Sequence, residues 1–150
     1  MRLCTIGYEG WGFEVWLDAL RSQGVRTVID VRELPLSRRP GWSKRALAER
    51  LAENGLGYVH VRALGSPAPL RHALRSGDLS FGEFAPQFEA LLEDRDEDLE
   101  ALLHLARSQT VALMCWEENP GACHRSLVAK ALERRAGEPV EVCDIRRMDF

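Results

Sequence analysis

Short apolar runs rich in β-branched residues alternate along the chain with longer stretches in which apolar residues recur at helical spacing. Runs of the first kind predict buried strands, and stretches of the second kind predict amphipathic helices. We expect strands at 3–7, 25–31, 58–61, 111–115 and 140–145. We expect helices at 13–23, 43–55, 80–92, 99–108 and 123–137. This alternation predicts an α/β fold, a mainly parallel sheet of about five strands with helices on both faces in a Rossmann-like arrangement.

Two further segments lack a clear period. Residues 62–78 contain two prolines and two glycines, so we predict mostly loop there, with at most one helical turn. Residues 93–100, EDRDEDLE, are acidic, and we expect them to interrupt or expose the helical pattern rather than to bind a ligand. Between them, Ser80 and Glu83 have the spacing of a capping box, which marks the start of a helix.

The composition is that of an ordinary globular protein. The chain has 150 residues, 45% hydrophobic and 29% charged, which predicts one soluble domain over 1–150. Its net charge of −3 gives no overall basic surface for nucleic acid, so any basic contact must be local. The first residues lack the apolar run of a signal peptide, and no segment is long enough to cross a bilayer. We therefore expect a cytoplasmic protein with no membrane partner, whose cysteines are reduced thiols: Cys4, Cys115, Cys123 and Cys143.

Polar side chains stand at the ends of three of the expected strands, at 7–10, 30–44 and 114–126. Parallel strands point the same way, so all three exits should lie at one edge of the sheet, where α/β proteins bind their ligands. The polar residues expected to converge there are Tyr8, Glu9, Asp30, Arg32, Ser37, Arg38, Glu117, His124 and Arg125.

The second exit carries the only dense group of basic residues. The group consists of Arg32, Arg38, Arg39, Lys44 and Arg45, with Trp42 among them. Guanidinium groups suit phosphate or carboxylate oxygens, and an exposed tryptophan could stack on a base. The alternative is a solvated loop in which Trp42 packs on the core and Asp30 pairs with Arg32 or Arg125, since a buried carboxylate needs a partner. For the group as a whole we favour oxyanion recognition.

The third exit contains the segment MCWEENPGACHRS, residues 114–126. We predict that Cys123 and Arg125 lie in the first turn of a helix, whose amides and dipole would favour an anion and lower the pKa of the cysteine. The same dipole disfavours an arginine there, so Arg125 should face a negative group. That group could be a ligand, Glu117, Glu118 or Asp30.

Two other kinds of site compete for the same segment. Cys115, Cys123 and His124 are suitable zinc ligands, but their C-x7-C-H spacing is not that of a common zinc knuckle, and the other cysteines lie in the middle of strands. A thiol-based phosphatase cradle would need a short glycine-rich loop, whereas this loop is long and acidic. We therefore assign no metal ligands and do not favour the phosphatase interpretation.

The segments TIGYEG, DVRELPLSRRPGWSK, YVHVRALG and MCWEENPGACHRSLVA together resemble the domain of unknown function 488 family, in the same order and over nearly the whole chain. The resemblance implies the family's α/β fold but no established activity. Of the two adjacent acids, only Glu117 falls at a motif position, so Glu118 is expected to be incidental. The residues at motif positions are Gly7, Tyr8, Asp30, Arg32, Pro35, Ser37, Arg38, Cys115, Glu117, Cys123, His124 and Arg125.

Three functions remain open at this stage, and the cofactor, if any, is unknown. The first is an enzyme, degenerate enzyme or binding protein for a phosphate-bearing small molecule or nucleotide. Its ligand-binding residues would be Gly7, Tyr8, Arg32, Ser37, Arg38 and Arg125. Its catalytic residues would be Asp30, Glu117, Cys123 and His124. The second is a nucleic-acid-binding accessory module that uses 32–45, and the third is a zinc-stabilised structural domain.

Overall fold

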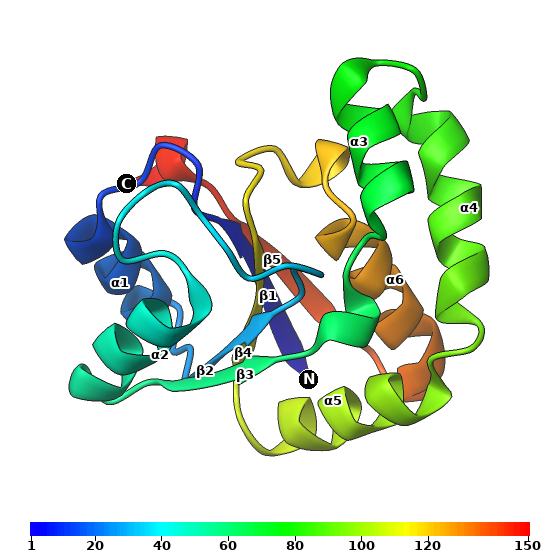
Figure 1. Ribbon diagram of the computed structural model, residues 1–150. Helices are drawn as coiled ribbons and strands as arrows, with labels where there is room; N and C mark the ends of the chain where they lie inside the picture. Colours follow the sequence, from blue (N-terminus) through cyan, green and yellow to red (C-terminus); the bar gives the residue numbers. More distant parts are fainter.

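A computed structural model describes residues 1–150 and contains one sheet of five parallel strands in the order β3-β2-β4-β1-β5 (Figure 1). The strands are β1 (Arg2–Gly7), β2 (Thr27–Asp30), β3 (Gly57–His60), β4 (Val111–Cys115) and β5 (Glu141–Ile145). The predicted α/β class and the five-stranded parallel sheet are confirmed. The three central strands are buried on both faces, which explains their nearly continuous apolar sequences.

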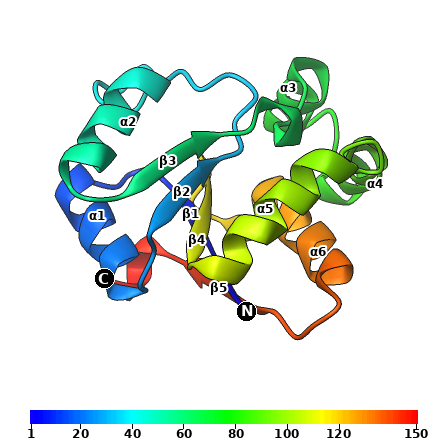
Figure 2. The same ribbon diagram turned by 90° about the horizontal axis from the view of Figure 1, so that it is seen from below.

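Helices cover both faces of the sheet, as predicted. The helices are α1 (Phe13–Ser22), α2 (Lys44–Glu53), α3 (Ala68–Ser76), α4 (Phe81–Leu92), α5 (Asp96–Ser108) and α6 (Arg125–Ala136). Short 3-10 turns are η1 (Arg62–Leu64), η2 (Pro120–Ala122) and η3 (Arg147–Asp149). Helices α1 and α2 lie on one face, and α5 and α6 lie on the other (Figure 2). None of these helices combines the length and apolar character that a membrane span requires.

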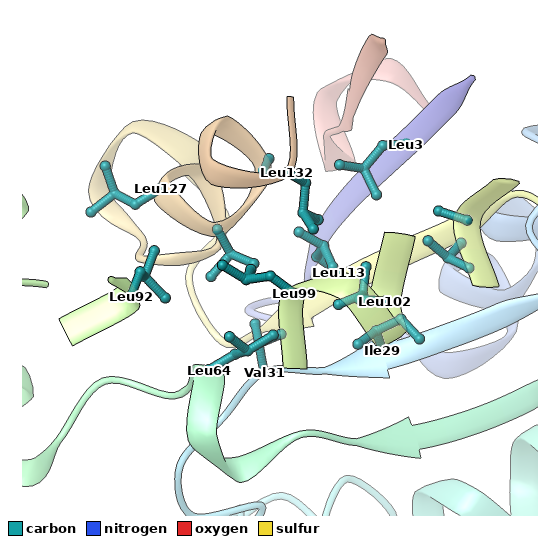
Figure 3. Packing of buried hydrophobic residues seen from close by; sticks show 14 of the residues in the cluster. Leu3, Ile29, Val31, Leu64, Leu92, Leu99, Leu102, Leu113, Leu127 and Leu132 are labelled. Atoms are coloured by element: carbon teal, nitrogen blue, oxygen red, sulfur yellow. The ribbon is translucent and has the colours of Figure 1, made fainter. Parts of the chain in front are cut away.

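The core consists of one apolar layer on each face of the sheet. On one face, 20 buried residues join the strands to α4, α5 and α6. Figure 3 shows Ile29 and Leu113 of the sheet packed beside Leu99 and Leu102 of α5. On the other face, 18 buried residues join the strands to α1 and α2.

The prediction for 62–78 is wrong, because Ala68–Ser76 form the helix α3. Pro67 is its N-cap and Pro69 lies in its first turn, where a missing backbone N–H breaks no helical hydrogen bond. Gly77 ends the helix with a φ of 86°. No residue of α3 is fully buried, and the helix packs beside α4 rather than directly on the sheet (Figure 2).

The acidic segment 93–100 interrupts the helical pattern as expected. Helix α4 ends at Leu92 and α5 begins at Asp96, which places three acidic residues in the first turn of α5. Negative charge at that end of a helix is stabilising. The predicted capping box is also present, since the Ser80 hydroxyl accepts from the Glu83 amide at 3.1 Å and the Glu83 carboxylate accepts from the Ser80 amide at 3.0 Å.

Candidate functional site

A cleft of about 590 Å³ lies at the carboxyl edge of the sheet. The loops that follow β2 and β4 leave the sheet on this side, and α3 stands beside them (Figure 1). Strand β4 lies between β1 and β2, and it leads to α6 on one face, whereas its neighbours lead to α1 and α2 on the other. This divergence is the topological switch point at which parallel α/β sheets bind ligands. The lining residues are Tyr8, Arg32, Glu33, Leu34, Leu36, Ser37, Arg38, Arg39, Ser66, Arg71, His72, Arg75, Cys115, Trp116, Glu117 and His124.

The expected convergence of the three strand exits is confirmed, because each exit contributes to the cleft. The predicted site residues that line it are Tyr8, Arg32, Ser37, Arg38, Glu117 and His124. The predicted site residues that do not line it are Gly7, Asp30, Cys123 and Arg125. The first group therefore borders the cleft, whereas Asp30, Cys123 and Arg125 of the second group are buried behind its walls.

Asp30 forms an ion pair with Arg32. Of the two partners considered from the sequence, Arg32 and Arg125, the structure therefore selects Arg32. The carboxylate is fully buried and accepts from Arg32 Nε at 2.9 Å and from Nη2 at 2.7 Å. The Tyr58 hydroxyl donates to the same carboxylate. Burial alone would lower the pKa of Arg32, but the hydrogen bonds and charge of Asp30 outweigh it and raise that pKa. Burial and the negative charge of Asp30 raise the pKa of Tyr58.

The loop between β2 and α2 is held against the exit of β1 by arginine and aromatic contacts. Arg32 Nη1 donates to Tyr8 Oη at 3.3 Å and to the Trp42 carbonyl at 2.9 Å. Arg39 donates to the carbonyls of Tyr8 and Trp11. The rings of Tyr8 and Trp42 stack with centroids 5.0 Å apart, and Trp42 is only 2% exposed. Trp42 therefore packs in the core and is not presented for stacking on a base.

Helix α3 contributes cationic side chains that the sequence interpretation missed. Arg71 donates to the Ser66 carbonyl at 2.6 Å and to Glu33 Oε1 at 3.3 Å. Arg75 lies one turn further along, 3.6 Å from Glu117 Oε1. The sequence did contain a pattern that could have indicated them: Arg71 and Arg75 are four residues apart, a spacing that places two side chains on the same face of a helix. It was overlooked because 62–78 was predicted to be a loop.

Ser66 and Trp116 are further lining residues that were not predicted. The Ser66 hydroxyl is buried and has no hydrogen-bond partner in the protein. Buried hydroxyls are normally paired, so this one is a candidate partner for a bound molecule. The Trp116 ring is 37% exposed, and the Arg75 guanidinium lies over it at 5.3 Å from the centroid.

Cys115 and Cys123 form a disulfide, which corrects the expectation of four reduced thiols. Cys115 ends β4 and Cys123 directly follows η2, and the two are brought together because residues 116–122 fold back between them. The remaining cysteines, Cys4 and Cys143, are free and occupy the predicted mid-strand positions. They lie opposite each other on the neighbouring strands β1 and β5.

The start of α6 also differs from the prediction. Cys123 is extended, with φ −130° and ψ 139°, and the helix begins only at Arg125. The amides of the preceding turn bond within it, from Gly121 to Asn119 Oδ1 at 2.9 Å and from Cys123 to the Pro120 carbonyl at 3.3 Å. These two amides are therefore not free to bind an anion, and Cys123 does not lie in the first turn of a helix. Asn119 and Pro120 favour a 3-10 turn here instead.

Arg125 is fully buried, and no carboxylate forms an ion pair with it. It donates to the carbonyls of Glu117 and Glu118, and its Nη1 lies 3.4 Å from Cys115 Sγ. Burial lowers the pKa of Arg125 to about 10. Its partners are thus carbonyl dipoles and a sulfur, not the acidic side chains considered from the sequence. Glu118 is not incidental, because its carboxylate accepts from Trp11 Nε1 at 3.2 Å and from the Arg147 amide at 2.6 Å.

His124 is held in one orientation at the wall of the cleft. Its Nε2 lies 2.6 Å from the Val31 carbonyl oxygen. A carbonyl can only accept, so Nε2 carries the proton and Nδ1 carries a lone pair in the neutral ring. Nδ1 lies 3.9 Å from Cys123 Sγ. Burial lowers the pKa of His124, which favours this neutral form.

The fold and the cleft define a doubly wound α/β protein with an arginine-lined cleft at its switch point. A family model described as "Domain of unknown function DUF488" matches residues 13–132, and the chain belongs to this family. The resemblance noted in the sequence is thereby confirmed. Comparison with curated proteins and with solved structures produced no match.

Proposed function

We propose that the cleft binds a phosphate-bearing small molecule or a nucleotide. The observation that carries this proposal is the charge of the lining, in which five arginines outnumber two glutamates. The arginines are Arg32, Arg38, Arg39, Arg71 and Arg75. Guanidinium groups present paired donors that match phosphate oxygens, and a partly enclosed cleft strengthens their attraction to an anion.

The arginines divide into those that build the cleft and those that remain available. Arg32 and Arg39 are engaged by Asp30 and by backbone carbonyls, so they shape the wall. Arg38 is exposed and has no protein partner, and Arg75 is half exposed beside Glu117. We therefore assign direct contact with the phosphate to Arg38 and Arg75. The unpartnered Ser66 hydroxyl would supply a further hydrogen bond.

The rim of the cleft is suited to a ligand that has an apolar part as well as a phosphate. Leu34, Leu36 and Trp116 are exposed apolar residues, and all three line the cleft. An aromatic ring of this kind can stack on a nucleobase. The volume of about 590 Å³ lies within the range of small-molecule sites. These features favour a nucleotide over inorganic phosphate.

Isothermal titration calorimetry with adenosine monophosphate and diphosphate, inorganic phosphate and adenosine tests the proposal. We expect the nucleotides to bind more tightly than phosphate, and adenosine not to bind measurably. Arg38→Ala should weaken nucleotide binding about tenfold, because a charge-assisted hydrogen bond is lost from an exposed side chain. Arg45→Ala is the matched control, because Arg45 is 93% exposed on α2 and does not line the cleft.

Two results would contradict the proposal. The first is the absence of heat with every phosphorylated compound. The second is equal loss of affinity in the Arg38→Ala and Arg45→Ala variants, since this would show that binding follows overall charge rather than the cleft.

A further inference from the structure

At the wall of the cleft, two sulfurs and one imidazole nitrogen form a compact set of metal-binding atoms. The ligand atoms of Cys115, Cys123 and His124 all lie within 4.8 Å of one another, and all three residues are buried. The 3.9 Å between Cys123 Sγ and His124 Nδ1 is close to the edge of about 3.6–3.8 Å between two ligands of a tetrahedral zinc site. No other group of this kind occurs in the molecule.

His124 already has the outer hydrogen bond that metal-binding histidines use. Its Nε2–H donates to the Val31 carbonyl, which turns the unprotonated Nδ1 toward Cys123. In zinc proteins such a bond to a carbonyl fixes the tautomer and the ring orientation. The imidazole is therefore oriented for coordination before any ion arrives.

The charges around the sulfurs also fit a bound dication. Glu117 Oε2 lies 3.2 Å from Cys115 Sγ, within reach of a fourth coordination position. Two thiolates and one carboxylate around a divalent ion leave a single negative charge. Arg125 is fully buried, has no carboxylate partner and donates to Cys115 Sγ at 3.4 Å. It would neutralise that charge, which meets the requirement that buried charges are compensated.

The backbone spacing of the two cysteines allows them to act as separate ligands. Their Cα atoms lie 7.6 Å apart, wider than the separation of about 4.4–6.8 Å that disulfides usually have. We propose that Cys115 and Cys123 in their reduced form, together with His124 and with Glu117 beside them, bind a divalent ion of the zinc class, and that the disulfide is the oxidised, metal-free form.

The metal-binding form is reached by reduction of the disulfide. A dithiol reductant supplies two electrons and two protons to the disulfide and is itself oxidised. The ion then displaces both thiol protons.

The position of the site gives the ion access to the cleft. Cys115, Glu117 and His124 line the cleft, whereas Cys123 lies beneath it. An ion held there would face whatever occupies the cleft and could take an oxygen of that molecule as a ligand. The metal proposal stands on the side chains themselves and does not depend on nucleotide binding.

The test uses the full chain, reduced anaerobically with a dithiol that is then removed, and titrated with Co²⁺ and afterwards with Zn²⁺. We expect one equivalent of Co²⁺ to give the ligand-field bands of a tetrahedral ion and a thiolate charge-transfer band, and Zn²⁺ to abolish both. Cys123→Ser and His124→Gln should each weaken Zn²⁺ binding at least about tenfold, since each removes one ligand. The glutamine retains an amide N–H for the Val31 carbonyl. Cys143→Ser is the matched control, because it removes a free thiol on β5.

Circular dichroism of each variant verifies that it is folded before the titration. The proposal is overturned if reduced wild-type protein takes up no metal, or if folded Cys123→Ser and His124→Gln bind Zn²⁺ as tightly as Cys143→Ser does. Nucleotide titrations of the oxidised protein are unaffected by these results, so the failure of one proposal is distinguishable from the failure of the other.

Discussion

Asp30 and Arg32 form a bidentate ion pair beneath the cleft, with Nε–Oδ1 and Nη2–Oδ2 distances of 2.9 and 2.7 Å. Asp30 closes strand β2 and is fully buried, and Arg32 is only 6% exposed. The same guanidinium reaches Tyr8 and the carbonyl of Trp42. One buried pair thereby joins the end of β2 to the exit of β1 and to the loop that forms a wall of the cleft.

Breaking this pair should destabilise the protein strongly. Asp30→Asn keeps the shape of the side chain but leaves the buried Arg32 without a counter-charge. We expect the free energy of unfolding, measured by urea denaturation, to fall by about 3–5 kcal/mol, as for other buried pairs that lose one partner. Glu49→Gln should change it by less than about 1 kcal/mol, because the Arg45–Glu49 pair is exposed on α2. Equal effects of the two substitutions would show that the buried Asp30–Arg32 pair contributes no more to stability than the exposed Arg45–Glu49 pair does.

Gly7 supports the site by its lack of a side chain. A Cβ atom at this position would lie 1.9 Å from the carbonyl oxygen of Glu117, in the backbone that leaves β4. Gly7→Ala should therefore push the 116–118 segment away from β1 and lower the free energy of unfolding by about 1–3 kcal/mol, the usual range for overpacking. Urea denaturation measures the loss, and the near-ultraviolet circular dichroism of the aromatic side chains, to which Trp116 contributes, reports the displacement.

Gly82 provides the control for that substitution. It lies in the first turn of α4, where an added Cβ would meet only the Ser80 hydroxyl at 3.8 Å. Gly82→Ala should raise the free energy of unfolding by about 0.4–1 kcal/mol, because alanine restricts the unfolded chain. If both alanine variants were more stable than the wild type, the contact between Gly7 and Glu117 would be of no consequence.

Cys4 should make the protein less stable at alkaline pH. Burial, together with the neighbouring Cys143, raises the pKa of Cys4 from 9.0 to about 12. The folded state therefore holds the thiol proton more tightly than the unfolded state does. This contribution to stability is fully present below pH 9.0 and is lost progressively as the pH rises toward about 12.

Urea denaturation of the wild type and of Cys4→Ala across this pH range measures the effect. The alanine variant lacks the titrating thiol, so its free energy of unfolding should fall less steeply with pH. All other groups that titrate in this range are shared by the two proteins. Parallel pH profiles would mean that the thiolate of Cys4 forms as easily in the folded protein as in the unfolded chain.

Local sequence patterns were sufficient for most of the secondary structure. The apolar run 111–115 matches β4, because a central strand buried on both faces needs apolar residues at every position. The capping box at Ser80 and Glu83 was found because its hydrogen bonds join residues close together in the chain. Helix α3 was missed, since the prolines that start a helix also occur in loops.

The order of elements also determined where the site would be, because parallel strands must end at the same edge of the sheet. The roles of the individual residues depended instead on contacts between distant segments. Trp42 stacks on Tyr8, Arg71 and Arg75 enter the cleft from α3, and Arg125 lies against Cys115 rather than against an acid. Such pairings have no local period, since they are decided by how loops from separate strands pack at the sheet edge and by which buried charges find partners there.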